Sequence, residues 1–134
     1  MPSFSKASLD QLATCDERLQ RVMKEAIKEF DFSVIEGHRG EAAQNAAYAK
    51  GLSKLRWPHG NHNHLPSLAV DIAPYPLDWS DKLKAQLRFA YLAGHVMSVA
   101  KRLGIPLRWG GDWNRNQDPR DESFLDLPHF ELDL

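Results

Sequence analysis

Two histidines and an aspartate in this 134-residue sequence are of the types that bind a catalytic zinc ion. His64 lies seven residues before Asp71, and His129 lies near the C-terminus. Two imidazoles and one carboxylate leave the fourth position of a tetrahedral zinc ion open for water. Bound zinc lowers the pKa of that water to about 7, which supplies hydroxide near neutral pH. The spacing also occurs by chance, and each residue could instead be an ordinary surface or hydrogen-bonded side chain.

Asp71 is the more informative of the first two residues because it interrupts an apolar run, Leu-Ala-Val-Asp-Ile-Ala. An unpaired carboxylate in a buried strand is very costly, so Asp71 needs a partner. A metal ion would supply one. A buried ion pair with an arginine would do the same, and the residues alone do not separate these two possibilities.

Asp126 stands three residues before His129. Its carboxylate could therefore reach a water molecule bound at the same metal, as a general base requires. An aspartate in a turn before Pro128 is the alternative interpretation of the same spacing.

The elements that must position these residues follow from the hydrophobic pattern. Apolar residues at helical spacing predict amphipathic helices, and short runs rich in β-branched and aromatic residues predict strands. Gly51 and Gly104 are typical helix ends. The predicted helices span residues 8–29, 41–50 and 80–103, and the predicted strands span residues 32–35, 68–73, 107–109 and about 129–132. Irregular alternation of this kind is typical of an α+β domain.

The composition limits the remaining possibilities. The 17 basic and 18 acidic residues give a net charge of -1, which does not favour a nucleic-acid binder. The one cysteine, Cys15, excludes an intrachain disulfide and reads as a small core residue. The first residues lack the pattern of a signal peptide, and no run is long enough to span a bilayer. We expect a single domain over residues 1–134 without membrane insertion.

Several motifs together resemble the VanY-type zinc metallopeptidases, which comprise D-alanyl-D-alanine carboxypeptidases and L-alanyl-D-glutamate endopeptidases, many of them phage endolysins. The matches occur in the family's order: the strand ending in Gly37-His38-Arg39, then Gln44, then His64 to Asp71 followed by Ile-Ala-Pro, then Arg-Trp-Gly-Gly-Asp-Trp at 108–113, and last Asp126-x-x-His129. They extend over residues 32–132, nearly the whole chain.

The resemblance implies a role for each matched residue. His64, Asp71 and His129 would bind zinc, and Asp126 would be the general base. Arg39 would stabilise the oxyanion, and Gln44 would orient the substrate. From the residues alone, Arg39 could equally form an ion pair at a strand end, and Gln44 could be an exposed helix residue. The implied fold is a small domain with a short, mostly antiparallel sheet, packed helices and the zinc site at the sheet, as in the hedgehog and D-Ala-D-Ala peptidases.

Three positions depart from the family pattern. His62 stands where a serine is usual, Ser67 stands where a glycine is usual and follows Pro66, and Gly40 replaces a serine or threonine. His62 is close enough in sequence to compete with His64 as a ligand. The family spacing to Asp71 favours His64.

The resemblance and the short chain favour an L-alanyl-D-glutamate endopeptidase that acts on the peptidoglycan stem peptide. We expect a monomer with a single catalytic domain over residues 1–134 and no separate wall-binding domain. Such an endolysin would be made in the cytoplasm of the bacterial host and would reach the periplasmic wall after release. A D-alanyl-D-alanine carboxypeptidase is the alternative activity. A zinc-containing module that binds wall peptides without cleaving them is an alternative of another class. The consecutive residues His62-Asn63-His64 also suggest a metal-dependent nuclease of the His-Asn-His class. The residues that name that class are spread over a ββα-metal unit and do not follow one another directly.

Alternating oxygen-bearing residues after Trp109 raise the possibility of a regulatory calcium ion. Asp112, Asn114 and Glu122 would be its ligands, as in some phage relatives. The loop lacks the glycine and the final glutamate of an EF-hand. A solvated turn is the alternative interpretation.

Overall fold

A computed structural model describes residues 2–134. The helices are α1 (Lys6–Leu12), α2 (Glu17–Ala26), α3 (Glu41–Ala49) and α4 (Lys82–Leu103). The strands are β1 (Phe32–Glu36), β2 (Ala69–Pro74), β3 (Leu107–Trp109) and β4 (His129–Leu132). Two short 3-10 turns, η1 (Asn61–Asn63) and η2 (Pro119–Asp121), complete the list. The α+β class expected from the sequence is confirmed, and the strands lie within a few residues of the predicted ranges.

The four strands form one antiparallel sheet in the order β1-β2-β4-β3. Residues alternate between its two faces, so Val70 and Ile72 point into the core while Asp71 points away from it. The same alternation separates Phe130 from His129 on β4. One face therefore packs on the helices, and the other carries the candidate functional residues.

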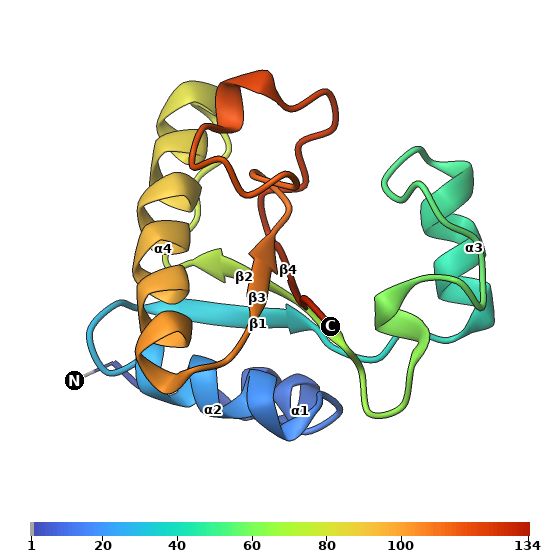
Figure 1. The fold of residues 1–134 in the computed structure, drawn as a ribbon, viewed down its shortest axis with the longest axis horizontal. Coiled ribbons are helices and arrows are strands. Elements are labelled where there is room, and N and C mark those ends of the chain that lie inside the picture. Colours follow the sequence, from blue (N-terminus) through green and yellow to red (C-terminus); the bar gives the residue numbers. More distant parts are fainter. Residues whose placement is uncertain (1) are drawn as a thin grey trace.

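Helices α2 and α4 pack on each other and on the core face of the sheet (Figure 1). Buried residues of both helices share the core with residues from all four strands. Helix α4 is capped at its N-terminus by Asp81, whose side chain accepts a hydrogen bond from the Lys84 amide, and at its C-terminus by Gly104 in the left-handed conformation (φ 70°). No helix among residues 2–134 combines the length and the apolar character needed to cross a membrane.

The single helix predicted over residues 8–29 is wrong: two helices, α1 and α2, are present with a break between them. The break is where the chain pairs with a distant segment. The Asp16 amide donates to the Ser67 carbonyl (2.8 Å), and the Ser67 amide donates to the Thr14 carbonyl (2.9 Å). These backbone groups cannot also continue a helix, so the tertiary contact overrides the local helical pattern.

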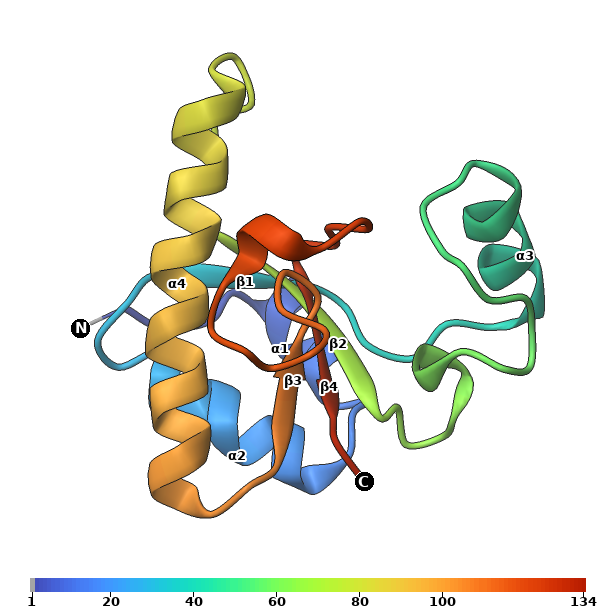
Figure 2. The same cartoon turned by 45° about the horizontal axis from the view of Figure 1, so that its top comes forward.

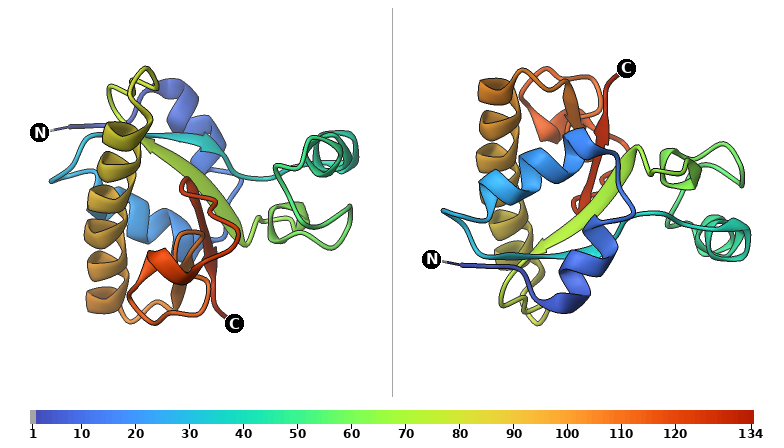
Figure 3. Two further views of the ribbon diagram at one scale, coloured as in Figure 1. Left: turned by 90° about the horizontal axis from the view of Figure 1, so that it is seen from above. Right: turned by 90° about the horizontal axis from the view of Figure 1, so that it is seen from below.

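Helix α3 and its flanking loops form an arm that stands apart from the sheet, on the side away from α4 (Figures 2 and 3). We call residues 40–60 the α3 arm. The chain leaves the sheet after β1 to enter this arm, and it returns through η1 to β2. The arm and the long connection between β3 and β4 are the two segments that flank the functional face.

Candidate metal centre and active-site cleft

Asp71 and His129 come together because β2 and β4 are neighbours in the sheet. They are directly opposed in the antiparallel register, so their side chains leave the same face. His129 Nδ1 lies 3.3 Å from Asp71 Oδ1. Strand pairing alone therefore places an imidazole beside a carboxylate.

His62 reaches the same point from the η1 turn. Its Nε2 lies 3.1 Å from Asp71 Oδ1 and 3.2 Å from His129 Nδ1. The turn is closed by hydrogen bonds between Gly60 and Asn63 and is tied to the segment after β1, where the Arg39 amide donates to the His62 carbonyl. Among residues 2–134, these three side chains form the one group of three or more His, Cys, Asp or Glu residues placed to share a metal ion.

Each histidine has one ring nitrogen in the cluster and one that points away from it. The hydrogen bond made by the outer nitrogen shows which of the two carries the proton. His62 Nδ1 lies 2.7 Å from the Gly37 carbonyl oxygen, which can only accept a hydrogen bond, so Nδ1 carries the proton. His129 Nε2 lies 2.7 Å from Glu131 Oε1, so Nε2 carries the proton there. Two imidazole lone pairs and one carboxylate are thus directed at one another, an arrangement that needs a shared cation.

The contacts within the cluster shift the pKa values of its members. Burial by itself would lower the pKa of His129, but hydrogen bonds with Asp71 and Glu131 outweigh it and raise this pKa to about 9. Burial would likewise raise the pKa of Asp71, but hydrogen bonds from His129 and His62 hold it well below its usual range. The site is thus arranged to hold positive charge.

His64, the histidine chosen from the sequence, does not join this group. Its side chain is exposed, and its backbone carbonyl oxygen lies 3.0 Å from His38 Nδ1. Ser67 is fully buried, and its hydroxyl donates to the Ala69 carbonyl (2.6 Å). Anchoring at Ser67 turns residues 64–66 outward and leaves His62 pointing inward. The side chains placed to share a metal ion are thus those of His62, Asp71 and His129, and His64 is not among them.

Arg39 lies beside the cluster, at the end of β1. Its side chain pairs with Glu36, and its Nη2 lies 3.4 Å from Asp71 Oδ2. Its Nη1 donates to Gln44 Oε1 (3.0 Å). The ion pair that the residue pattern left open for Asp71 is present, together with the two histidines rather than in place of them.

Gln44 is 1% exposed, and its amide is fully used inside the protein. Oε1 accepts from Arg39 and from Asn63 Nδ2 (3.1 Å), while Nε2 donates to the Leu55 carbonyl (2.6 Å) and to Ser53 Oγ (2.9 Å). Gln44 thus joins the α3 arm to Arg39 and to the η1 turn. This position suits support of the cleft better than direct contact with a substrate.

Asp126 stands next to the cluster without belonging to it. Its Oδ2 lies 3.9 Å from His129 Nδ1, and its side chain is 27% exposed. The Asp126 amide donates to the Gly110 carbonyl (2.8 Å), and the Gly110 amide donates to the His129 carbonyl (2.7 Å), which fix this part of the chain. Burial raises the pKa of the Asp126 carboxyl, although the His129 charge opposes the rise.

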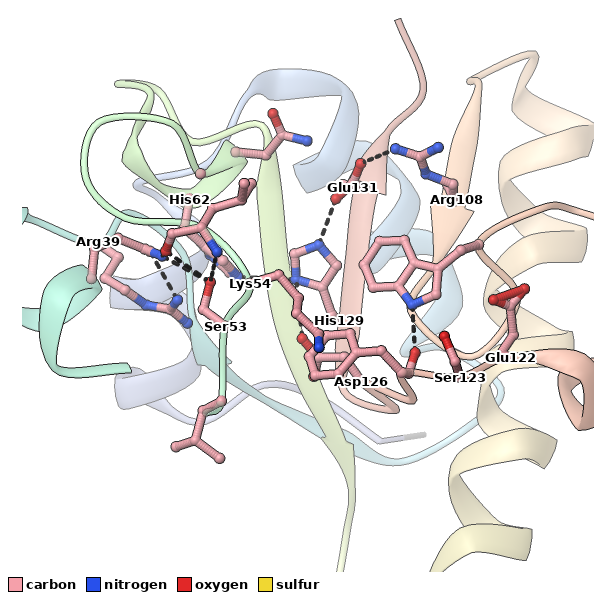
Figure 4. A pocket seen from close by; sticks show the side chains of 17 residues that line it. Arg39, Ser53, Lys54, His62, Arg108, Glu122, Ser123, Asp126, His129 and Glu131 are labelled. Carbon is pink, nitrogen blue, oxygen red and sulfur yellow. Dashed lines mark hydrogen bonds and ion pairs between the residues drawn. The ribbon is translucent and has the colours of Figure 1, made fainter. Parts of the chain in front are cut away.

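Glu131 and Arg108 were not identified from the sequence. Glu131 binds His129 on one side and Arg108 Nη2 on the other (2.6 Å), as Figure 4 shows. Burial would raise the pKa of Glu131, but these two hydrogen bonds outweigh it and lower the pKa to about 2. The sequence does contain a sign of Glu131. In a strand, residues two apart lie on the same face, so Glu131 must lie on the same face as His129.

A cleft of about 510 Å³ opens over these groups. Leu52 to Leu55 of the α3 arm line one side, and Trp113 with residues 122–124 of the β3–β4 connection line the other. Arg39, His62, Asp126 and His129 line it as well. Lys54 Nζ lies 5.0 Å from the centre of the Phe124 ring, so the two sides meet at this contact.

The loop considered for calcium is closed by its own hydrogen bonds. The Asp112 carboxylate accepts from the Asn116 amide (3.2 Å) and the Gln117 amide (2.9 Å), and Glu122 Oε1 accepts from the Asn114 amide (3.2 Å). Asp112, Asn114 and Glu122 are thus engaged as in a hydrogen-bonded turn. The expectation of calcium gains no support from the structure.

Comparisons with known proteins agree with one another. The model of the phage L-alanyl-D-glutamate peptidase family matches residues 2–133. The L-alanyl-D-glutamate peptidase of Escherichia phage T5 is 37% identical over 137 residues, which covers 96% of each chain. The crystal structure of the Serratia marcescens L-Ala D-Glu endopeptidase ChiX is similar with a TM-score of 0.71 and 28% identity, over 98% of this chain and 90% of that one. The chain belongs to the phage L-alanyl-D-glutamate peptidase family.

Proposed function

We propose that this peptidase hydrolyses the L-alanyl–D-glutamate bond of the peptidoglycan stem peptide with a zinc ion held by His62, Asp71 and His129. The observation that carries the proposal is the convergence of two imidazole lone pairs and one carboxylate on a single point. The family's activity indicates which peptide bond is cleaved, and the His-Asp-His cluster indicates a metal-dependent hydrolysis.

The spacing of the three candidate ligand atoms suits zinc. They lie 3.1, 3.2 and 3.3 Å from one another. Ligands at the corners of a tetrahedron with zinc–ligand distances of about 2.0–2.1 Å are about 3.3–3.4 Å apart. Three ligands of nitrogen and oxygen also leave one position for water, as catalytic zinc sites do. The donor set therefore fits the metal that the family resemblance implied.

When bound, zinc would polarise the scissile carbonyl and lower the pKa of water to about 7. Asp126 would take the proton of the attacking water and return it to the leaving D-glutamate amine. Its position beside the cluster and its raised pKa suit both halves of that transfer. The backbone hydrogen bonds between Asp126 and Gly110 and between Gly110 and His129 support this role, because they restrict the position of Asp126 beside the cluster.

Arg39 would stabilise the negative charge that develops on the carbonyl oxygen. It lines the cleft, and its side chain is only 12% exposed, so its charge acts in a water-poor environment. Glu36 and Gln44 hold the guanidinium in place without moving it away from the cluster. Gln44 would contribute by this support and not by direct substrate contact.

Digestion of purified Gram-negative peptidoglycan tests the proposal. The zinc-loaded protein, the chelator-treated protein and the chelated protein with zinc restored are compared by mass spectrometry of the released fragments. We expect zinc-dependent release of peptides that begin with D-glutamate and glycans that end in L-alanine. Release of free D-alanine alone would instead identify a D-alanyl-D-alanine carboxypeptidase. An intact wall in the presence of protein with bound zinc would indicate a peptide-binding module.

The same proposal includes the setting of the enzyme. We propose that residues 1–134 act as one catalytic unit, as a monomer, and that the protein reaches the periplasmic wall from the host cytoplasm at lysis. Light scattering of the zinc-loaded protein tests the monomer. The route to the wall is tested by adding the protein to intact cells and to cells with a permeabilised outer membrane. We expect lysis of the permeabilised cells alone, because the outer membrane blocks access to the wall from outside.

A further inference from the structure

The paired strands β4 and β3 place a second ionic group behind the proposed zinc ligands. Glu131 lies two residues after His129 on β4, and Arg108 on β3 is its direct partner in the antiparallel register. His129 Nε2 lies 2.7 Å from Glu131 Oε1, and Arg108 Nη2 lies 2.6 Å from Glu131 Oε2. The Glu131 and His129 side chains are 7% and 9% exposed, so water competes little for these contacts.

This arrangement controls which nitrogen of His129 faces the cluster. A carboxylate can only accept, so it keeps the imidazole proton on Nε2 and leaves the Nδ1 lone pair toward Asp71 and His62. A carboxylate behind a metal-binding histidine also increases the basicity of the ring. Arg108 compensates the charge of Glu131, which would otherwise be costly to bury.

Trp113 connects the same group to the wall of the cleft. The Arg108 guanidinium lies 5.7 Å from the centre of the Trp113 ring, and the Trp113 ring centre lies 5.5 Å from that of His129. Trp113 Nε1 donates to the Phe124 carbonyl (2.7 Å). The indole therefore contacts both His129 and Arg108, which restricts the rotation of both side chains.

We propose that Glu131 and Arg108 are positioning residues that fix His129 with Nδ1 toward the zinc ion, with Trp113 packed against both His129 and Arg108. The proposal rests on the zinc site proposed above. It assigns to the Arg108–Glu131 pair a contribution to metal affinity and to turnover, without any contact with the substrate.

A different role for Arg108, direct binding of a substrate carboxylate, is less compatible with its contacts. Its Nη2 is engaged by Glu131, and its Nε is buried without a hydrogen-bond partner among the described residues, where no substrate atom can reach it. Its side chain is 31% exposed and lines the cleft, so the alternative is kept as an outcome of the test.

The first experiment measures zinc affinity of the metal-free proteins by competition with a chromophoric chelator. The variants are Glu131→Gln and Arg108→Gln, with Glu25→Gln as the control, because Glu25 is also ion-paired but lies on the exposed surface of α2. Loss of an outer partner of a metal-binding histidine costs about 10- to 100-fold in affinity. We expect a loss in this range for Glu131→Gln, a smaller loss for Arg108→Gln and none for the control.

The double variant tests whether Arg108 acts through Glu131. We expect Arg108→Gln to have little further effect in the Glu131→Gln background, since the two residues form one unit. Arg108→Lys should recover much of the affinity lost in Arg108→Gln, because the charge is restored. Should Glu131→Gln fail to fold, the zinc affinity of Arg108→Gln still tests the proposal, because Arg108 is partly exposed and its replacement disturbs the core less.

Kinetics at saturating zinc and NMR separate positioning from other roles. We expect kcat to fall about 10- to 100-fold in Glu131→Gln with KM little changed, and the Nε2–H resonance of His129 to exchange faster with water. Unchanged zinc affinity in both variants would overturn the proposal, as would a rise in KM alone for Arg108→Gln. A wild-type protein that binds no zinc would instead contradict the proposed function itself.

Discussion

Two of the three proposed zinc ligands stand on paired strands, and the third stands on a short turn. Asp71 and His129 face each other because β2 and β4 are hydrogen-bonded in a fixed register. His62 depends on contacts between segments that are distant in sequence. It bonds to Gly37 and Arg39, and the Ser67 hydroxyl donates to the same Gly37 carbonyl. The strand-borne half of the site is thus a local consequence of the sheet, and the turn-borne half is a consequence of packing.

The difference teaches where this site is rigid and where it can be disturbed. Displacing a strand-borne ligand requires breaking the sheet. The turn-borne ligand can be displaced by changing one buried contact behind it, without touching the ligand. Asp126, the proposed proton acceptor, resembles the turn-borne half, because it lies in a connection that is fixed at Gly110.

The largest effect on catalysis without loss of metal is expected for Asp126→Asn. The side chain lies 3.9 Å from His129 Nδ1 and outside the ligand cluster, so zinc should remain bound. Loss of general base catalysis costs about 10²- to 10⁴-fold in rate. Turnover of a stem-peptide substrate and zinc content by atomic absorption check this. Retained activity would show that another group accepts the proton.

Gly37→Ala should disturb the turn-borne ligand from behind. A Cβ at Gly37 would lie 2.6 Å from the Gln11 carbonyl oxygen and 2.8 Å from Cys15 Sγ, so the chain must shift, and the Gly37 carbonyl that holds His62 Nδ1 must shift with it. Overpacking of this kind costs about 1–3 kcal/mol in the free energy of unfolding. Chemical denaturation and zinc titration should both report the change.

The matched control is Gly94→Ala, in the middle of α4. No atom lies within 4 Å of a Cβ built there, so the substitution should raise the free energy of unfolding by about 0.5–1 kcal/mol. Zinc affinity should stay at the wild-type value. Equal loss of zinc affinity in both variants would mean that the Gly37 effect is not transmitted through His62.

The pH dependence of the metal-free protein should report the strand-borne half. The pKa of His129 is raised from its ordinary 6.5 to about 9, so its contribution to stability is complete below pH 6.5 and is lost as the pH rises through 9. The pKa of Glu131 is lowered from 4.5 to about 2, so its contribution is complete above pH 4.5 and is lost as the pH falls through 2. Thermal unfolding should therefore show these contributions greatest between pH 4.5 and 6.5.

Zinc should remove the alkaline part of this dependence, because the metal replaces the shared proton on His129. The Tm of the zinc-loaded protein should not fall between pH 6.5 and 9 as that of the metal-free protein does. Parallel decline of both forms would show that His129 is not a zinc ligand.

Much of the strand-borne half could be predicted from the sequence. Asp71 in an apolar run and His129 near a final strand were identified, and the strands were placed within a few residues. What could not be predicted has a common cause. Ser67 pairs with Thr14 and Asp16, which breaks the predicted helix, and it also anchors the chain that turns His62 inward and His64 outward. A tertiary contact of one residue thus accounts for both errors.

The family spacing pointed to His64 because it counts seven residues to Asp71, while His62 is nine residues away. The departures at Pro66 and Ser67 mark the place where the loop differs, and in this loop His62 rather than His64 lies beside Asp71 and His129. Glu131 could not be predicted for another reason. Its proposed positioning role depends on Arg108 of the paired strand, and the register of two strands cannot be derived from the sequence of either strand alone.

Zinc content of two variants, His62→Ala and His64→Ala, tests the central claim most directly. Both proteins are expressed alike, dialysed against the same low concentration of zinc and measured by atomic absorption alongside the wild type. We expect His64→Ala to retain one zinc ion per chain and His62→Ala to lose most of it, because His62, and not His64, lies beside Asp71 and His129. The reverse result, with zinc retained in His62→Ala and lost in His64→Ala, would contradict the metal centre described here.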